Sequence, residues 1–196
     1  MSGESDGALV RQCAAEDAEA LRALHERHAP ALLRFLERLL HDRDRAEDVC
    51  QEAFLRIWRR AELFDPARGT FTAWLYRAAA NLAFNRLALK SATEKELSAL
   101  PVLPAAAGDA PHESAAVSER GELLHAALAT LSAQDRAILT LRHLDERPVA
   151  EIASILGIPE GTVKSRVHYA LRRLRDALGP RLGEIPEREE NSARGG

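Results

Sequence analysis

Residues 148–167 read PVAEIASILGIPEGTVKSRV, and this stretch decides the class of fold. Its first nine residues have the apolar spacing of a short helix, and the GIP at 157–159 indicates a turn. A second helix opens at Glu160. Ala153 and Gly157, four residues apart, are small enough for the close crossing and tight turn of a helix-turn-helix. The sequence therefore predicts this motif in the C-terminal part of the chain.

The second helix of the motif, predicted over 160–178, has one apolar side and one basic side. On a helical wheel the residues that face inward are Val163, Val167, Ala170, Leu171 and Leu174. Between Gly161 and Arg175 the sequence holds five basic residues and no acidic one. Cations pair with phosphates, and short polar side chains near a helix start reach base edges, so this pattern favours DNA binding. A solvated surface helix is the plainer interpretation, but it does not explain why the turn, the small residues and the acid-free face coincide.

The whole chain of 196 residues has a helical composition, because Ala, Leu, Arg and Glu dominate and apolar residues do not alternate with polar ones. Apolar spacing predicts helices over 17–40, 42–61, 70–90, 117–130, 132–143, 149–156 and 160–178. Pro30 lies inside the first of these, where we expect a kink or a split. We therefore expect an all-α protein of two small helical domains joined by a flexible linker, the C-terminal one being the helix-turn-helix.

The predicted domain boundaries follow changes in composition. Residues 1–90 form the N-terminal helical domain, and residues 117–178 form the helix-turn-helix domain. Between them, residues 91–116 are first polar and then rich in Pro and Ala, which is typical of a flexible linker. The tail over 179–196 contains two prolines and ends in Gly-Gly, and we expect it to be disordered.

Targeting and redox signals indicate a cytoplasmic protein. The start of the chain is acidic and polar, so it lacks the basic and apolar regions of a secretory signal. No apolar run approaches the roughly 18–20 residues that a membrane helix needs. The two cysteines, Cys13 and Cys50, form no CxxC pair, and neither a zinc knuckle nor a disulfide framework is indicated.

Charge is informative by segment rather than as a total. The formal net charge of −3 excludes a histone-like polycation. Residues 54–90 nevertheless carry seven basic against two acidic side chains, and residues 159–178 carry five against two. The stretches 1–53 and 91–122 are acidic. Two basic islands therefore lie inside an acidic chain, each at the end of one predicted domain.

Motifs for catalysis and metal binding are weak. His25-Glu26-Arg27-His28 places its second histidine at i+3, whereas the metalloprotease motif HExxH needs i+4. His25, His28 and Cys13 could still form a metal site, although ordinary surface and packing roles fit them better. The sequence contains no GxSxG and no Gly-rich phosphate loop. We predict that the protein is not an enzyme and has no catalytic residue, no metal and no cofactor.

The predicted helix over 42–61 has an exposed side that could fit a protein partner. Asp48, Gln51 and Glu52 lie opposite the apolar stripe, and Leu55 lies among them. An apolar anchor inside a polar rim is typical of a docking spot. On the helical wheel alone, docking and a chance exposed leucine fit equally well.

Residues 54–90 interleave aromatic side chains with arginines, Arg60 and Arg86 among them. This composition is typical of a surface that stacks unpaired bases and follows a phosphate backbone. Five residues have the spacing of a helix core and are assigned to packing: Phe71, Trp74, Leu75, Ala78 and Leu82. Packing does not explain Phe64 in a predicted loop, nor Asn81 and Asn85 near a helix end.

Two pairs of stretches resemble one known family. The runs DRAEDVCQEAFLRIW at 44–58 and WLYRAAAN at 74–81 resemble region 2 of the extracytoplasmic-function (ECF) sigma factors, group IV of the sigma-70 family. The runs EIA at 151–153 and GTVKSR at 161–166 resemble region 4 of the same family. The matched order covers roughly residues 8–178, and the paired match is far more specific than either motif alone. The resemblance implies a bacterial transcription initiation factor that binds core RNA polymerase and directs it to specific promoters.

The resemblance also implies roles for individual residues. The set that docks on the polymerase clamp helices is Asp48, Gln51, Glu52 and Leu55. The set at the −10 element is Phe64, Asn81 and Asn85 for flipped, unpaired bases, with Arg60 and Arg86 as cations. The set that reads the −35 element in the major groove is Gly161, Thr162, Lys164, Ser165, Arg166, His168, Tyr169 and Arg172. The chain departs from the family pattern at 85–90, where NRLALK carries fewer cations than is usual.

The partners implied by the resemblance are core RNA polymerase, promoter DNA and an anti-sigma protein that wraps both domains. Two other interpretations of the residues stay open. In one, residues 1–90 sense a ligand and residues 117–178 bind an operator as a dimer, without polymerase. In the other, the chain is a sigma-like decoy that sequesters a regulator. Transcription with purified core polymerase distinguishes the three.

Overall fold

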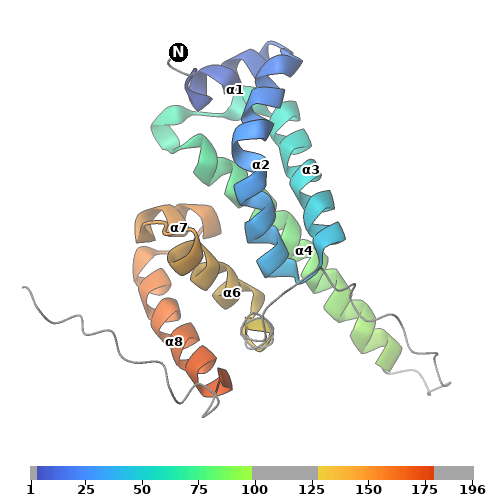
Figure 1. The fold of residues 1–196 in the computed structure, drawn as a ribbon, viewed down its shortest axis with the longest axis vertical. Coiled ribbons are helices and arrows are strands. Elements are labelled where there is room, and N and C mark those ends of the chain that lie inside the picture. Colours follow the sequence, from blue (N-terminus) through green and yellow to red (C-terminus); the bar gives the residue numbers. More distant parts are fainter. Residues whose placement is uncertain (1–3, 99–127, 179–196) are drawn as a thin grey trace, which may run out of the picture.

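The computed structural model describes residues 4–98 and 128–178, and helices are the regular secondary structure of these ranges (Figure 1). The predicted all-α fold class is confirmed. The N-terminal half holds α1 (Asp6–Ala14), α2 (Ala18–Leu40), α3 (Arg43–Arg59), the 3-10 turns η1 (Ala61–Leu63) and η2 (Pro66–Arg68), and α4 (Phe71–Ser98). The C-terminal half holds α6 (Ala133–Leu139), the π-helical turn η3 (Thr140–Leu144), α7 (Val149–Leu156) and α8 (Glu160–Leu178).

Helices α2, α3 and α4 pack along one another as a bundle, with α1 across one end (Figure 1). The apolar stripe of α2 enters this bundle, and Leu32, Phe35, Leu36 and Leu39 are fully buried. Their spacing of i, i+3, i+4 and i+7 is the helical period that the sequence displays. The bundle core is therefore built on a pattern that is visible in the sequence.

The tight connection from α2 to α3 depends on two consecutive residues. His41 ends α2 in the left-handed region, with a φ of 53°. Asp42 then accepts a 3.0 Å hydrogen bond from the backbone N–H of Arg45, which caps the start of α3. These two residues set the antiparallel packing of α2 and α3.

Pro30 does not divide α2, which is continuous from Ala18 to Leu40. The predicted split is therefore wrong. Proline has no N–H to give to the carbonyl four residues earlier, which is that of Glu26. Because Pro30 is exposed, that carbonyl can bond to water and the helix can continue.

Helix α1 is an element that the sequence analysis did not predict. The hydroxyl of Ser5 caps it by accepting a hydrogen bond from the N–H of Ala8. Leu9, Val10 and Cys13 are buried on one side of this helix. The stripe spans little more than one turn, which is too short for a periodicity argument to detect.

Helix α4 is longer than predicted, since it continues through 91–98 to Ser98. The prediction that the linker begins at 91 is wrong in this respect. The eight added residues contain neither Gly nor Pro, so nothing in their chemistry ends a helix. The rest of the predicted linker, most of the predicted helix over 117–130, and the tail over 179–196 lie outside the described residues.

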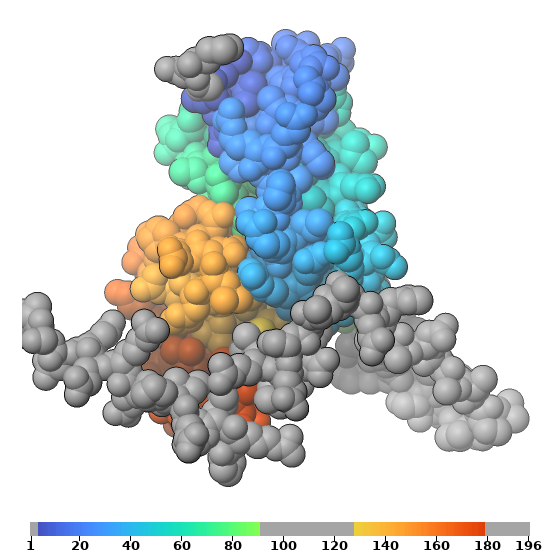
Figure 2. All heavy atoms as spheres, in the orientation of Figure 1, coloured from blue at the N-terminus to red at the C-terminus, as the bar shows by residue number. Residues whose placement is uncertain are grey.

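The two halves pack against each other and share one hydrophobic core. Ile138, Leu141, Ile152 and Ile155 are buried in the same cluster as the apolar residues of α2 to α4. Figure 1 shows α7 beside α4 and α6 below α2, and Figure 2 shows the two halves in direct contact on the visible face. The helix-turn-helix is thus held on the side of the bundle.

Arg136 connects the two halves through helix ends. Its guanidinium donates a 2.7 Å hydrogen bond to the carbonyl of Leu39, one of the last carbonyls of α2. The same group donates to the carbonyls of Leu128 and Leu131 at 3.1 and 3.3 Å. Carbonyls at helix ends have no partner within their own helix, so one buried cation satisfies such groups from both halves.

Polar groups at the edge of this contact are less well satisfied. The guanidinium of Arg147 lies 4.1 Å from the ring centre of the buried Tyr76, and Arg38 lies 3.7 Å from Asp145. Within the described ranges, the buried Oδ2 of Asp145 and the buried Oγ1 of Thr140 have no hydrogen-bond partner. Burial also raises the pKa of Asp145 above its ordinary value. The contact between the halves therefore combines a well-packed core with buried polar groups whose hydrogen bonding is incomplete.

Over 4–98 and 128–178, no helix is long and apolar enough to cross a membrane.

Candidate nucleic-acid interface

The predicted docking residues share one side of α3. Asp48, Gln51 and Leu55 are exposed and Glu52 is half-buried, at the helical spacing of i, i+3, i+4 and i+7. Leu55, the apolar member of the set, is 48% exposed. We call these four residues the docking strip. The structure brings them together as an apolar side chain within a polar rim.

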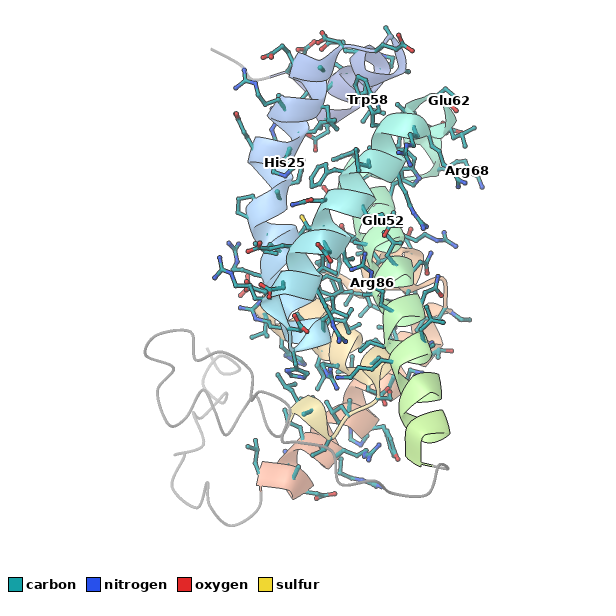
Figure 3. The ribbon with its side chains drawn as sticks, turned by 90° about the vertical axis from the view of Figure 1, so that its right-hand side faces the viewer. His25, Glu52, Trp58, Glu62, Arg68 and Arg86 are labelled. Atoms are coloured by element: carbon teal, nitrogen blue, oxygen red, sulfur yellow. The ribbon has the colours of Figure 1, made fainter. Side chains whose placement is uncertain are left out.

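Arg86 on α4 reaches across to this strip. Its guanidinium lies 3.4 Å from Oδ2 of Asp48 and 3.2 Å from Oε2 of Glu52. Figure 3 shows Glu52 and Arg86 facing each other between α3 and α4. Glu52 also accepts a 2.9 Å hydrogen bond from Arg56. The family resemblance assigns Arg86 to the −10 set. In the structure, its guanidinium pairs with the carboxylates of two docking-strip residues, Asp48 and Glu52.

Phe64 lies at the start of the loop between η1 and η2. It is half-buried, and its ring centre is 5.4 Å from that of Trp74 and 6.3 Å from that of Phe71. Phe71, at the start of α4, is 2% exposed and belongs to the core, as predicted from its spacing. One side of the Phe64 ring is thus supported by the first turn of α4.

The other members of the −10 set do not form a single pocket with Phe64. Asn81 and Asn85 are exposed four residues apart on α4, so they share a side of this helix. They lie about 10 and 16 Å along the helix axis beyond Trp74. Arg60 is exposed at the end of α3. The predicted set therefore extends along the bundle as an elongated surface.

The helix-turn-helix has the predicted turn. Gly157 ends α7 with a φ of 67°, a conformation that favours glycine. The N–H of Thr162 then donates to the carbonyl of Pro159 at 2.9 Å as α8 begins. A Cβ at Gly157 would lie 3.3 Å from Nη2 of Arg77, so the turn closely approaches α4.

The predicted −35 residues are all carried by the first three to four turns of α8. Five are exposed beyond the opening Gly161: Lys164, Ser165, His168, Tyr169 and Arg172. Thr162 and Arg166 are half-buried, while Val163 and Ala170 on the opposite side are buried. The prediction that Leu171 faces inward is wrong, because it is 39% exposed.

Arg166 is held by a residue that the sequence analysis missed. Its guanidinium lies 3.3 Å from Oδ1 of Asp135, and Oδ2 of Asp135 accepts a 2.7 Å hydrogen bond from the hydroxyl of Ser132. Ser132 also caps α6 by accepting from the N–H of Asp135. A sequence signal for Asp135 does exist, because Ser132 and Asp135 have the Ser-x-x-Asp spacing of a capping box. Asp135 therefore positions one predicted DNA-reading arginine.

A second residue missed by the sequence analysis is Arg173. Its guanidinium and that of Arg172 lie 5.9 and 6.0 Å from the ring centre of Tyr169. Two cations thus flank an exposed aromatic ring on the basic side of α8.

The candidate metal ligands have other contacts. His28 is 2.9 Å from a carboxylate oxygen of Asp6, and the ring of His25 packs 4.8 Å from that of Phe54. Cys13 and Cys50 are buried, and burial raises the pKa of the Cys50 thiol to about 11. In the part of the chain that the structure describes, no group of three or more His, Cys, Asp or Glu could hold a metal ion.

Comparisons with known families match both halves of the chain. Sigma-70 region 2 matches residues 24–93, and Sigma-70 region 4 matches residues 121–174. The ECF RNA polymerase sigma factor SigL of Mycobacterium tuberculosis is 38% identical over 172 residues, which are 87% of this chain and 96% of SigL. The ECF RNA polymerase sigma factor SigW of Bacillus subtilis is 29% identical over 86% of this chain and 94% of SigW.

A solved structure agrees with this result. The sigma factor RpoE of Bartonella quintana, crystallised in complex with the anti-sigma factor NepR, has a TM-score of 0.65 and 25% identity to this chain. The similarity covers 80% of this chain and 95% of that one.

A helix-turn-helix packed on a helical bundle, with both halves matched by sigma-70 regions, defines a transcription factor of the sigma type. The chain belongs to the ECF RNA polymerase sigma factors, which are bacterial transcription initiation factors. The family match favours this function over the ligand-sensing regulator considered above.

Proposed function

We propose that this sigma factor uses three separate surfaces: the docking strip for core RNA polymerase, the Phe64 loop with α4 for the −10 element, and α8 for the −35 element. The observation that carries the proposal is the docking strip, because a regulator that binds DNA alone has no use for it. An exposed leucine ringed by Asp48, Gln51 and Glu52 provides an apolar anchor and a polar rim.

At the −10 element, the Phe64 ring acts as a wall for a base taken out of the stack. Unpaired bases stack on aromatic rings, and amides such as those of Asn81 and Asn85 can bond to base edges. The two asparagines are exposed on one side of α4, which suits an elongated single strand. Arg60, exposed near the loop, supplies a cation for the backbone.

At the −35 element, α8 enters the major groove with its N-terminal half. Lys164 and Arg172 are exposed cations, and Ser165 and His168 are polar groups of the size that reaches base edges. Arg166 contributes through a fixed geometry, since Asp135 holds it from behind. The backbone N–H of Gly161, in the first turn of α8, is part of the positive end of the helix dipole, which suits a phosphate.

The factor acts in the cytoplasm, where polymerase and promoters are, and it performs no chemistry of its own. An anti-sigma protein is its regulator, by similarity to RpoE of Bartonella quintana, which is bound to the anti-sigma factor NepR. We assign no residues to that contact.

Transcription of sheared genomic DNA by purified core polymerase tests the proposal. We expect that adding the chain yields RNA with a small set of defined 5′ ends. Leu55→Ala combined with Asp48→Ala should weaken association with core polymerase, whereas Lys164→Ala should leave that association intact and reduce the defined transcripts. A chain that protects DNA from nuclease without polymerase would instead be an operator-binding regulator. A chain that neither transcribes nor protects DNA would be a decoy.

A further inference from the structure

Helix α1 precedes the segment that matches Sigma-70 region 2, which begins at residue 24, yet it is firmly attached to the bundle. Asp6 in its first turn pairs with Arg27 and lies 2.9 Å from Nε2 of His28, both on α2. Arg27 also donates a 3.1 Å hydrogen bond to the backbone carbonyl of Glu4. One carboxylate with two partners, partly withdrawn from water, fixes where α1 begins.

The same end of α1 touches the loop that carries Phe64. A Cβ at Gly7 would lie 3.9 Å from Cε1 of the Phe64 ring, which is ordinary van der Waals contact. A methyl group at Gly7 would reach the Phe64 ring at contact distance, so only a side chain longer than that of alanine would press on the ring.

A second route connects Asp6 to Phe64 through the core. The ring of His28, which pairs with Asp6, lies 5.1 Å from that of Phe71. Phe71 in turn lies 6.3 Å from Phe64, which also packs against Trp74. The Phe64 ring is thus supported by α4 on one side and by α1 on another.

We propose that α1 is a backing element that positions Phe64 for base capture at the −10 element, with Gly7 and Asp6 as positioning residues. This inference rests on the proposed role of Phe64. An aromatic wall presents a flipped base to the amides that read its edges only if its own position is fixed, and a half-buried ring on a short loop needs support from neighbouring elements. Removing the Asp6 contacts, or filling the space at Gly7, should therefore change base selectivity rather than promoter location.

The test uses the chain bound to core polymerase and a single-stranded DNA pool of random sequence. Bound molecules are sequenced, and the ratio of the preferred to the next base is measured at the most selective position. We expect Gly7→Met to lower this ratio several-fold, because the added side chain displaces the Phe64 ring. Gly7→Ala should retain the ratio, since its Cβ makes an ordinary contact. Ala14→Met, which adds the same side chain at an exposed position of α1, is the matched control.

Two further variants make the outcomes distinct. Asp6→Asn removes the negative charge that pairs with Arg27 without adding bulk. We expect it to lower the ratio in the same direction, and this result tests the proposal even if Gly7→Met folds poorly. Phe64→Ala removes the wall itself and should lower the ratio at least as far. If Phe64→Ala lowers the ratio while Gly7→Met and Asp6→Asn leave it unchanged, the inference about α1 is wrong and the role of Phe64 stands. If Phe64→Ala has no effect, both are wrong.

Discussion

At the scale of single residues, the largest difference from expectation is the position of Arg86. A cation beside Asn85 in sequence is a natural candidate for a phosphate contact, but its guanidinium faces Asp48 and Glu52 instead. Helical spacing shows which residues share a side of one helix, and it cannot show which side chains meet between two helices. The pairing of Arg86 with the docking strip could therefore come only from the structure.

The pairing of Arg86 can be tested by the salt dependence of promoter binding. Each phosphate contact contributes about one unit to the slope of log affinity against log salt concentration. We expect Arg172→Ala to reduce that slope by about one, because Arg172 is exposed on α8. Arg86→Ala should leave the slope unchanged when core polymerase is saturating. A reduced slope for Arg86→Ala would return this residue to the DNA-binding set.

At the scale of elements, the turn between α7 and α8 illustrates what sequence can predict well. Gly157 was expected in the turn, and it occupies the left-handed region at a φ of 67°. The amphipathic pattern of α8 also predicted its exposed residues, apart from Leu171. These features could be predicted because a turn and the exposed side of a helix depend on residues that are only a few positions apart in the sequence.

Substitution of Gly157 should destabilise the protein. An alanine in the left-handed region is unfavourable by about 1–2 kcal/mol, because its Cβ approaches the following carbonyl. The matched control is Gly161→Ala in α8, where a Cβ meets nothing within 4 Å and where alanine favours the helix by about 1 kcal/mol over glycine. Urea denaturation measures both free energies of unfolding. Equal stabilities of the two variants would contradict the reading of this turn.

Elements that sequence did not predict share a physical cause. Helix α1 is only nine residues long, so its buried stripe of Leu9, Val10 and Cys13 gives almost no periodicity. The last eight residues of α4 are polar, and a polar helix resembles a linker when apolar spacing is the criterion. A periodicity argument needs an apolar pattern that repeats over several turns. Helix α1 is too short to have one, and the end of α4 is too polar.

At the scale of the whole molecule, the packing of the two halves was not foreseen. The sequence predicts two domains joined by a flexible linker and does not address contact between them, whereas Ile138 and Ile155 share the core of the N-terminal bundle. The apolar residues of α6 and α7 were identified, but their pattern cannot tell whether they pack within one half or across both. The charged residue at the centre of the contact, Arg136, carried no signal at all.

Arg136→Met should lower the stability of the folded chain by about 2–3 kcal/mol, because the carbonyls of Leu39, Leu128 and Leu131 lose a buried donor that methionine cannot replace. Arg175→Met, at an exposed position of α8, is the control. Urea denaturation followed by circular dichroism measures both. A variant as stable as the control would show that water replaces the guanidinium.

The pH dependence of stability should report on Asp145. Its pKa is raised above the ordinary value, because burial outweighs the nearby arginines. A carboxyl with a raised folded pKa favours folding below its unfolded pKa, and that contribution is lost as pH rises through the folded pKa. We therefore expect Asp145→Asn to gain stability relative to the natural chain as pH increases from 4 to 7.5. Parallel stability curves for the two proteins would contradict this.

The bond from Arg136 to Leu39 joins residues 97 positions apart, and this separation has a consequence for the order of folding. Contacts within the bundle and within the helix-turn-helix connect segments that are much closer in sequence, so their loops close at a lower entropic cost. Rates of folding fall as contacts become more distant along the chain. We therefore expect each half to form before the contact between them during refolding, with Arg136 buried in the last step.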